Sequence, residues 1–192
     1  MEYAKSFSEG LEVYLKDNKG RNGASKKSEL DIQSVSSSSF GVLEKGKMYA
    51  FEYYATTVPF FDSHPIVIGL GRSDNGHQLG LNLHWIPYSF RVSFLKDLTN
   101  SLQSEISQQL KGMKLGNPSL QSPINYLTWE NLKVTYQRKY NLKNGVRQYM
   151  LNSMRSVREI GYEKWYLGAV HNENYFIGGT IGQAQSLYFS NI

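Results

Sequence analysis

The segment that most constrains the fold is residues 66–87, IVIGLGRSDNGHQLGLNLHWIP. Two apolar runs flank the polar stretch SDNG, and Asn75-Gly76 is a dipeptide that accepts the positive φ angles of a tight β turn. In the second run, leucines and a tryptophan alternate with polar or glycine residues, which is the period of a strand with one buried face. The segment therefore predicts a β-hairpin, with Trp85 at the end of its second strand.

Neighbouring segments extend this hairpin into a mixed fold. Residues 47–54, KMYAFEYY, are rich in aromatic residues and favour a further strand. After Pro87 the spacing becomes helical, which predicts a helix with Phe90 and Phe94 on its apolar face and a second helix over residues 102–113. The fold class we expect is α+β, with a small antiparallel β sheet or SH3-like barrel, packed helices and an extended N-terminal arm.

The second half of the chain is less regular. We expect a helix from Thr128, a residue type that caps helices, to about Tyr140, and another helix over residues 146–154. Asn144-Gly145 separates the two. The segments SVREI and EKWYLGAV are candidate strands.

The first 45 residues differ from the rest of the chain in the spacing of their apolar residues. Apolar residues at positions 3, 7, 11 and 14 suit a short amphipathic helix, but the following KDNKGRNGASKKSE has no apolar period. We expect residues 1–45 to be an N-terminal arm, partner-binding or flexible, and residues 46–192 to be the α+β core domain. No apolar run approaches the roughly 20 residues that cross a bilayer, and the start lacks the order of a secretion signal, so we expect neither membrane nor export.

No motif in the chain indicates catalysis. There is no cysteine, no GxSxG and no GxxxxGK[ST] run, and the GLG at residues 69–71 lacks the third glycine and the following helix of a dinucleotide fingerprint. A metal hydrolase that uses Asp62, His64 and His84 is an alternative, but nothing in their spacing brings these side chains together. We expect no catalytic residue, no metal, no cofactor and no small-molecule substrate.

We favour a structural interpretation of the hairpin residues. Asp62, Asn82 and His84 are expected to be polar residues that fix the hairpin and the loop before it. Trp85 is expected to be the packing anchor of the hairpin, because tryptophan is more often core than contact.

Positive charge is concentrated in one stretch. Residues 101–150 contain seven basic and two acidic residues, which accounts for the whole formal net charge of +5. Tyrosines are interleaved with the basic residues, a combination that suits anionic contacts and base stacking, but also a solvated helix face or a surface docked on an acidic protein. The candidates for nucleic-acid contact are Lys133, Arg138, Lys139, Lys143 and Arg147.

Three segments together resemble a known family. GKMYAFEYYATT, PFFDSHPIVIGL and LGLNLHWIPYSFRVSFLKDL are similar to small virion-associated proteins of T-even-like tailed phages, often labelled DNA end protector proteins. YMLNSMRSVREIGYEKWYLGAV fits the same family, so that the resemblance covers about residues 46–170. The matching positions are Gly46, Tyr49, Phe51, Tyr53, Phe61, Asp62, Pro65, Gly80, Asn82, His84, Trp85, Pro87, Arg91, Leu95, Arg155 and Trp165.

The resemblance implies a protein of the virion, assembled in the host cytoplasm, and not an enzyme. Our first hypothesis is a non-enzymatic structural component of the neck, tail or baseplate, which acts through contacts with other virion proteins in a symmetric assembly. The alternative is a DNA-binding protein that protects packaged genome ends from exonuclease, with duplex DNA ends as its partner.

Overall fold

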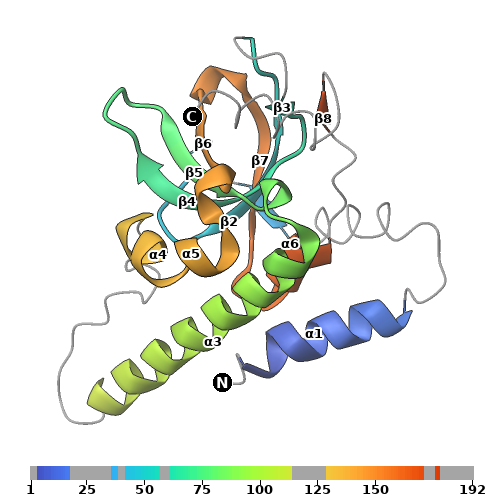
Figure 1. The fold of residues 1–192 in the computed structure, drawn as a ribbon, viewed down its shortest axis with the longest axis vertical. Helices are drawn as coiled ribbons and strands as arrows, with labels where there is room; N and C mark the ends of the chain where they lie inside the picture. The colour runs from blue at the N-terminus through green and yellow to red at the C-terminus, as the bar shows by residue number, and fades with distance from the viewer. Residues whose placement is uncertain are drawn as a thin grey trace.

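The computed structural model describes residues 4–17, 36–38, 42–56, 61–113, 129–170 and 176–177 (Figure 1). Its centre is a six-stranded antiparallel sheet in the order β1-β7-β2-β4-β5-β6. The strands are β1 (Ser36–Ser38), β2 (Met48–Tyr53), β4 (Ile66–Arg72), β5 (Gln78–Asn82), β6 (Val146–Tyr149) and β7 (Met154–Ile160). A separate antiparallel pair is formed by β3 (Phe61–Asp62) and β8 (Phe176–Ile177).

This arrangement confirms the α+β class and the antiparallel sheet. In the described part of the chain the two outer strands, β1 and β6, do not pair with each other. The sheet is therefore open, and an SH3-like barrel is not confirmed.

Strands β4 and β5 form the predicted hairpin. The Gly76 N–H donates to the Ser73 carbonyl at 2.9 Å, and Gly76, not Asn75, supplies the positive φ of 80°. The prediction of a strand through Trp85 is wrong, because β5 ends at Asn82. The Asn82 side-chain oxygen accepts the N–H of His84 at 2.9 Å, which turns the chain into a short 3-10 helix, η1 (Leu83–Trp85).

Both faces of the sheet are covered. On one face Leu81 of β5 packs with Phe94 and the other buried residues of the helices. The opposite face carries a smaller cluster whose aromatic rings meet edge to face with centroids 5.0–6.4 Å apart, namely Phe51, Tyr53 and Tyr149. For this reason the polar positions of β5, Gln78 and Asn82, are buried and not solvated as the alternation predicts.

One long helix, α3 (Tyr88–Met113), follows the hairpin where the sequence predicts two. No glycine or proline interrupts residues 88–111. The Thr99 hydroxyl bonds back to the Leu95 carbonyl at 2.7 Å, so this side chain is satisfied without leaving the helix. The polar stretch near residue 100 therefore does not break the helix.

Two other predicted elements are wrong in type. Residues 146–154 do not form an α-helix but β6, the 3-10 helix η4 (Leu151–Ser153) and the start of β7, because β6 pairs along β5. EKWYLGAV is not a strand but forms η5 (Tyr162–Lys164) and α6 (Tyr166–Val170). A Cβ at Gly168 would lie 2.8 Å from the leucine of η1, so the glycine lets α6 approach the core. The SVREI strand is confirmed as part of β7.

The helix predicted to end near Tyr140 is divided into α4 (Trp129–Thr135) and α5 (Gln137–Tyr140). Tyr136 stands between them with φ of −122°, and the left-handed Asn141 ends α5 before η3 (Leu142–Gly145). The predicted cap, Thr128, lies outside the described residues.

The predicted N-terminal helix is confirmed as α1 (Ala4–Asp17), which lies beside α3 and contacts α3, α6 and η5 (Figure 1). The approach is close, since a Cβ at Gly10 would lie 2.6 Å from the Tyr166 ring, and Leu11 packs against the core. The first helix therefore rests on its own chain. The division into an arm over residues 1–45 and a core stays a prediction.

Candidate nucleic-acid interface

Three of the predicted motif residues meet in a buried network. Asp62 Oδ2 lies 2.7 Å from His84 Nδ1 and accepts the Asn82 amide at 3.0 Å. Asp62 Oδ1 accepts the backbone N–H of His64 at 3.1 Å. The side chains of Asp62 and His84 are 1% and 0% exposed. The network connects β3 to the end of β5 and leaves neither the Asp62 carboxylate nor the His84 ring open to solvent.

The electrostatics of this network follow from its burial. Burial alone would raise the pKa of Asp62, but the charge of a protonated His84 and the hydrogen bonds from His84, Asn82 and the His64 N–H lower it below its ordinary value. Tyr149 is buried nearby, and its burial and then the negative charge of Asp62 raise its pKa well above the ordinary value. The carboxylate is thus ionised at neutral pH, enclosed by its own partners.

The alternatives based on metal or nucleotide chemistry gain no support from the described residues. No three of their His, Asp or Glu side chains come together as metal ligands. The His64 ring places Nδ1 2.9 Å from the Ser63 hydroxyl. A Cβ at Gly69 would lie 2.1 Å from the Glu44 carbonyl oxygen, so this glycine of the GLG run is required by backbone packing.

The ring of Trp85 contacts Arg147, one of the residues predicted to contact nucleic acid. The Arg147 guanidinium carbon lies 3.8 Å from the centroid of the buried Trp85 ring, and Arg147 Nη1 donates to the Val146 carbonyl at 3.1 Å. This cation–π contact holds the Arg147 guanidinium against the protein's own core. Arg147 therefore differs from the other four predicted contacts.

Those other four residues have exposed side chains: Lys133 on α4, Arg138 and Lys139 on α5, and Lys143 on η3. Helix α4 contacts α5, and α5 contacts η3, so the four cations lie on adjoining parts of the structure. We call Lys133, Arg138, Lys139 and Lys143 the basic helical segment. The segment is anchored by inward side chains that belong to the core, namely Leu132, Tyr136, Tyr140 and Leu142.

One cation of this segment is held by an acidic residue of α3. Lys139 Nζ lies 2.6 Å from Asp97 Oδ2, and the Tyr140 hydroxyl donates to the same oxygen at 2.5 Å. The hydrogen bonds from Lys139 and Tyr140 lower the pKa of Asp97, and the bond to Asp97 raises the pKa of Lys139. The side chain of Lys139 is 63% exposed and that of Asp97 is 38% exposed, so water and anions reach the contact.

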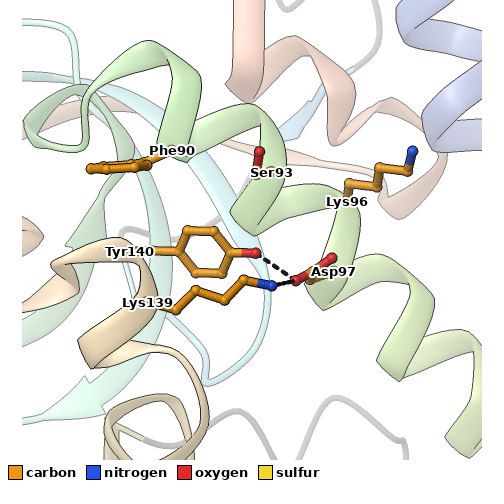
Figure 2. Close-up of a pocket in the computed structure, with 6 residues that line it drawn as sticks. All are labelled: Phe90, Ser93, Lys96, Asp97, Lys139 and Tyr140. Atoms are coloured by element: carbon orange, nitrogen blue, oxygen red, sulfur yellow. Dashed lines mark hydrogen bonds and ion pairs between the residues drawn. The ribbon is translucent and has the colours of Figure 1, made fainter.

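Figure 2 shows the hollow beside this contact, between α3 and α5. It has a volume of about 530 Å³ and is lined by Phe90, Ser93, Lys96, Asp97, Lys139 and Tyr140. The sequence pattern does not indicate this hollow, because it places Phe90 on the buried face of its helix, whereas the residue is 44% exposed. The available signal is an aromatic residue, Phe90, and a lysine, Lys96, on one predicted helix in a chain of positive charge.

These features belong to an α+β protein with an enclosed polar network and exposed cations on α4, α5 and η3. A family model described as the phage T4 terminal DNA protecting protein matches residues 16–122. The matched range is more than half of the chain, and the chain belongs to this family of phage proteins. No curated protein and no solved structure matches the chain.

The match confirms the resemblance to DNA end protector proteins of phages. It does not confirm our first hypothesis, a structural component of the neck, tail or baseplate, and it favours the alternative of DNA-end protection. The matched residues include the hairpin and α3, whereas α4, α5 and η3 follow them. No helix of the described part of the chain is long and apolar enough to cross a membrane.

Proposed function

We propose that this protein binds the ends of linear duplex DNA and shields them from exonuclease, by occupying the end and not by a reaction of its own. The observation that carries the proposal is the match to the terminal DNA protecting family. The exposed cations of the basic helical segment support it, because lysine and arginine are the usual partners of phosphate groups.

The proposed place of action is the phage particle, where packaged genome ends lie, after assembly in the host cytoplasm. Other virion proteins are the proposed neighbours. Exposed apolar side chains on α1, Val13 and Leu15, support a contact of this helix with another protein.

Binding by the basic helical segment is chiefly electrostatic. Each phosphate that a lysine or arginine neutralises releases condensed counterions, so log Kobs falls with log salt concentration by about 0.9 per contact. Three or four contacts predict a slope of roughly −3 to −4. Association should accordingly weaken steeply between low and physiological salt.

The test compares a linear duplex with a closed circle of the same sequence, using the full chain. We expect tighter binding to the linear duplex and slower digestion of that duplex by a double-strand exonuclease. The double variant Arg138→Glu with Lys143→Glu should weaken both effects by about tenfold or more at low salt.

The matched control is Arg72→Glu with Arg155→Glu, which makes the same charge change at exposed arginines of β4 and β7. It should have a much smaller effect. Equal losses in the two double variants would reject the basic helical segment as the binding site. A wild-type protein that gives linear DNA no protection would reject the function.

A further inference from the structure

The hollow between α3 and α5 is lined by aromatic residues as well as by lysines, and phosphate binding alone does not require the aromatic residues. Its volume of about 530 Å³ lies within the range of small-molecule sites, about 300–1,000 Å³. One wall is the exposed Phe90 ring on α3, and the opposite wall is Lys139 with Tyr140 on α5 (Figure 2). An aromatic surface facing a cation is the pairing that single-stranded nucleic-acid sites use.

We propose that this hollow holds the unpaired terminal nucleotide of a DNA end, with its base against Phe90 and its phosphate near Lys139. The inference rests on the proposed function and deepens it, because it gives the protein a means to distinguish an end from the interior of a duplex.

The exposure of Phe90 supports the position of the base. Phe94, one turn further along α3, is fully buried and meets the Tyr136 and Tyr140 rings with centroids 5.6 and 5.7 Å apart. Phe90 is 44% exposed and lines the hollow together with Tyr140 of this cluster. A flat base laid on this ring would cover apolar surface, and every base has a face that can stack in this way.

The cations support the position of the phosphate. The Lys139 ammonium lies 2.6 Å from Asp97, and Lys96, exposed on α3, extends away from that pair in Figure 2 and adds positive charge at the edge of the hollow without meeting the same phosphate. Two ammonium groups and one carboxylate leave the hollow with an excess of one positive charge. The Asp97 carboxylate is also an acceptor for exocyclic amino groups of bases such as cytosine.

The geometry of DNA explains why only an end would fill the hollow. Inside a duplex the bases are stacked and paired, and bringing one out costs a few kcal/mol. A terminal overhang presents bases that are already unpaired. The basic helical segment would then supply most of the affinity, and the hollow would supply the preference for ends.

The test measures the affinity of the full chain for a duplex with short single-stranded overhangs and for a closed circle of the same sequence. We expect Phe90→Ala to weaken overhang binding about tenfold and to leave binding to the circle unchanged. The salt dependence should also stay the same, because no phosphate contact is removed. Phe90→Trp should retain the affinity for overhangs, since it retains a stacking surface.

The matched control is Tyr88→Ala, which removes another exposed aromatic ring of α3, 50% exposed and not part of the hollow. It should leave both affinities unchanged. Equal effects of Phe90→Ala and Tyr88→Ala would overturn the inference. So would an overhang preference that survives in Phe90→Ala, which is also the result expected if the hollow receives a protein segment.

The failure of this inference is distinguishable from the failure of the proposed function. If the wild-type protein prefers linear DNA and Phe90→Ala does so equally, the end-binding function stands and the hollow is not its nucleotide site. If the wild-type protein binds neither DNA, both fail.

Discussion

Two contacts between a carboxylate and a basic side chain are almost equal in length and opposite in setting. Asp62 and His84 lie 2.7 Å apart with 1% and 0% of their side chains exposed, whereas Asp97 and Lys139 lie 2.6 Å apart with 38% and 63% exposed. The first pair is also bonded by Asn82 and by a backbone N–H, and the second by one tyrosine hydroxyl.

The difference teaches that contact length does not indicate role. A buried pair cannot exchange its partner for water, so the loss of one member leaves an uncompensated charge in the core. An exposed pair contributes little to stability because water and salt screen it, and for the same reason it can open to a phosphate. We therefore assign the buried contact to the fold and propose a role in binding for the exposed one.

The largest effect should come from breaking the buried pair. We expect His84→Ala to lower the free energy of unfolding by about 3–5 kcal/mol, because Asp62 is left charged and enclosed. Urea denaturation measures the change. His77→Ala, at a partly exposed position in the hairpin turn, is the control and should change stability little. A loss below about 1 kcal/mol for His84→Ala would contradict the role that we assign to the pair.

The pH dependence of stability sharpens the same comparison with a smaller effect. Because the pKa of Asp62 is lower in the folded protein than in the unfolded chain, the ionised carboxylate stabilises the fold above the unfolded pKa of about 3.9. This contribution is lost as the pH falls through the folded pKa. We expect the urea concentration at the unfolding midpoint of the wild type to decrease as the pH is lowered below about 4. The decrease should be smaller in Asp62→Asn. Equal slopes in the two proteins would contradict this prediction.

Arg147 is predicted to act on stability and not on DNA. Its contact with the Trp85 ring should contribute about 1 kcal/mol, so Arg147→Ala should lower the free energy of unfolding by that amount. Arg138→Ala, at an exposed position of α5, should have the reverse profile, with unchanged stability and weaker DNA binding. Thermal unfolding and a DNA titration of both variants separate the two outcomes. A DNA defect as large in Arg147→Ala as in Arg138→Ala would return Arg147 to the interface.

The smallest effect is expected at the exposed pair. Asp97→Asn removes the one carboxylate of the hollow and frees Lys139, so we expect unchanged stability and an affinity for DNA raised about two- to fivefold at low salt. The salt dependence should become steeper by about one contact. Weaker binding by Asp97→Asn would show instead that the carboxylate itself takes part in recognition.

Sequence patterns predict the local parts of this structure well. Asn75-Gly76 marks the hairpin, and the spacing after Pro87 marks α3, because both signals arise from neighbours in the chain. The end of β5 depends on a side chain, Asn82, that competes with the strand for a backbone N–H. The alternating pattern of the sequence does not report that competition. For this reason residues 83–85, which form η1, are predicted as a continuation of the strand.

The parts that sequence does not predict arise from contacts over long separations. Residues 146–149 form a strand because β5 offers them a partner, although their own pattern allows a helix. Asp97 and Lys139 are 42 residues apart, and Arg147 contacts Trp85 across a still longer separation in the sequence. Composition therefore shows where positive charge is concentrated in the sequence, but not which cations are held by contacts within the fold and which are exposed.

The strand order also bears on how this chain could be cut. Strand β7 pairs with β2, and β6 pairs with β5. Both β6 and β7 follow residue 122, where the family match ends. A fragment that stops there would retain β2, β4 and β5 with unpaired backbone groups along both margins. Such margins recruit strands from other molecules, so the fragment should self-associate more strongly than the full chain.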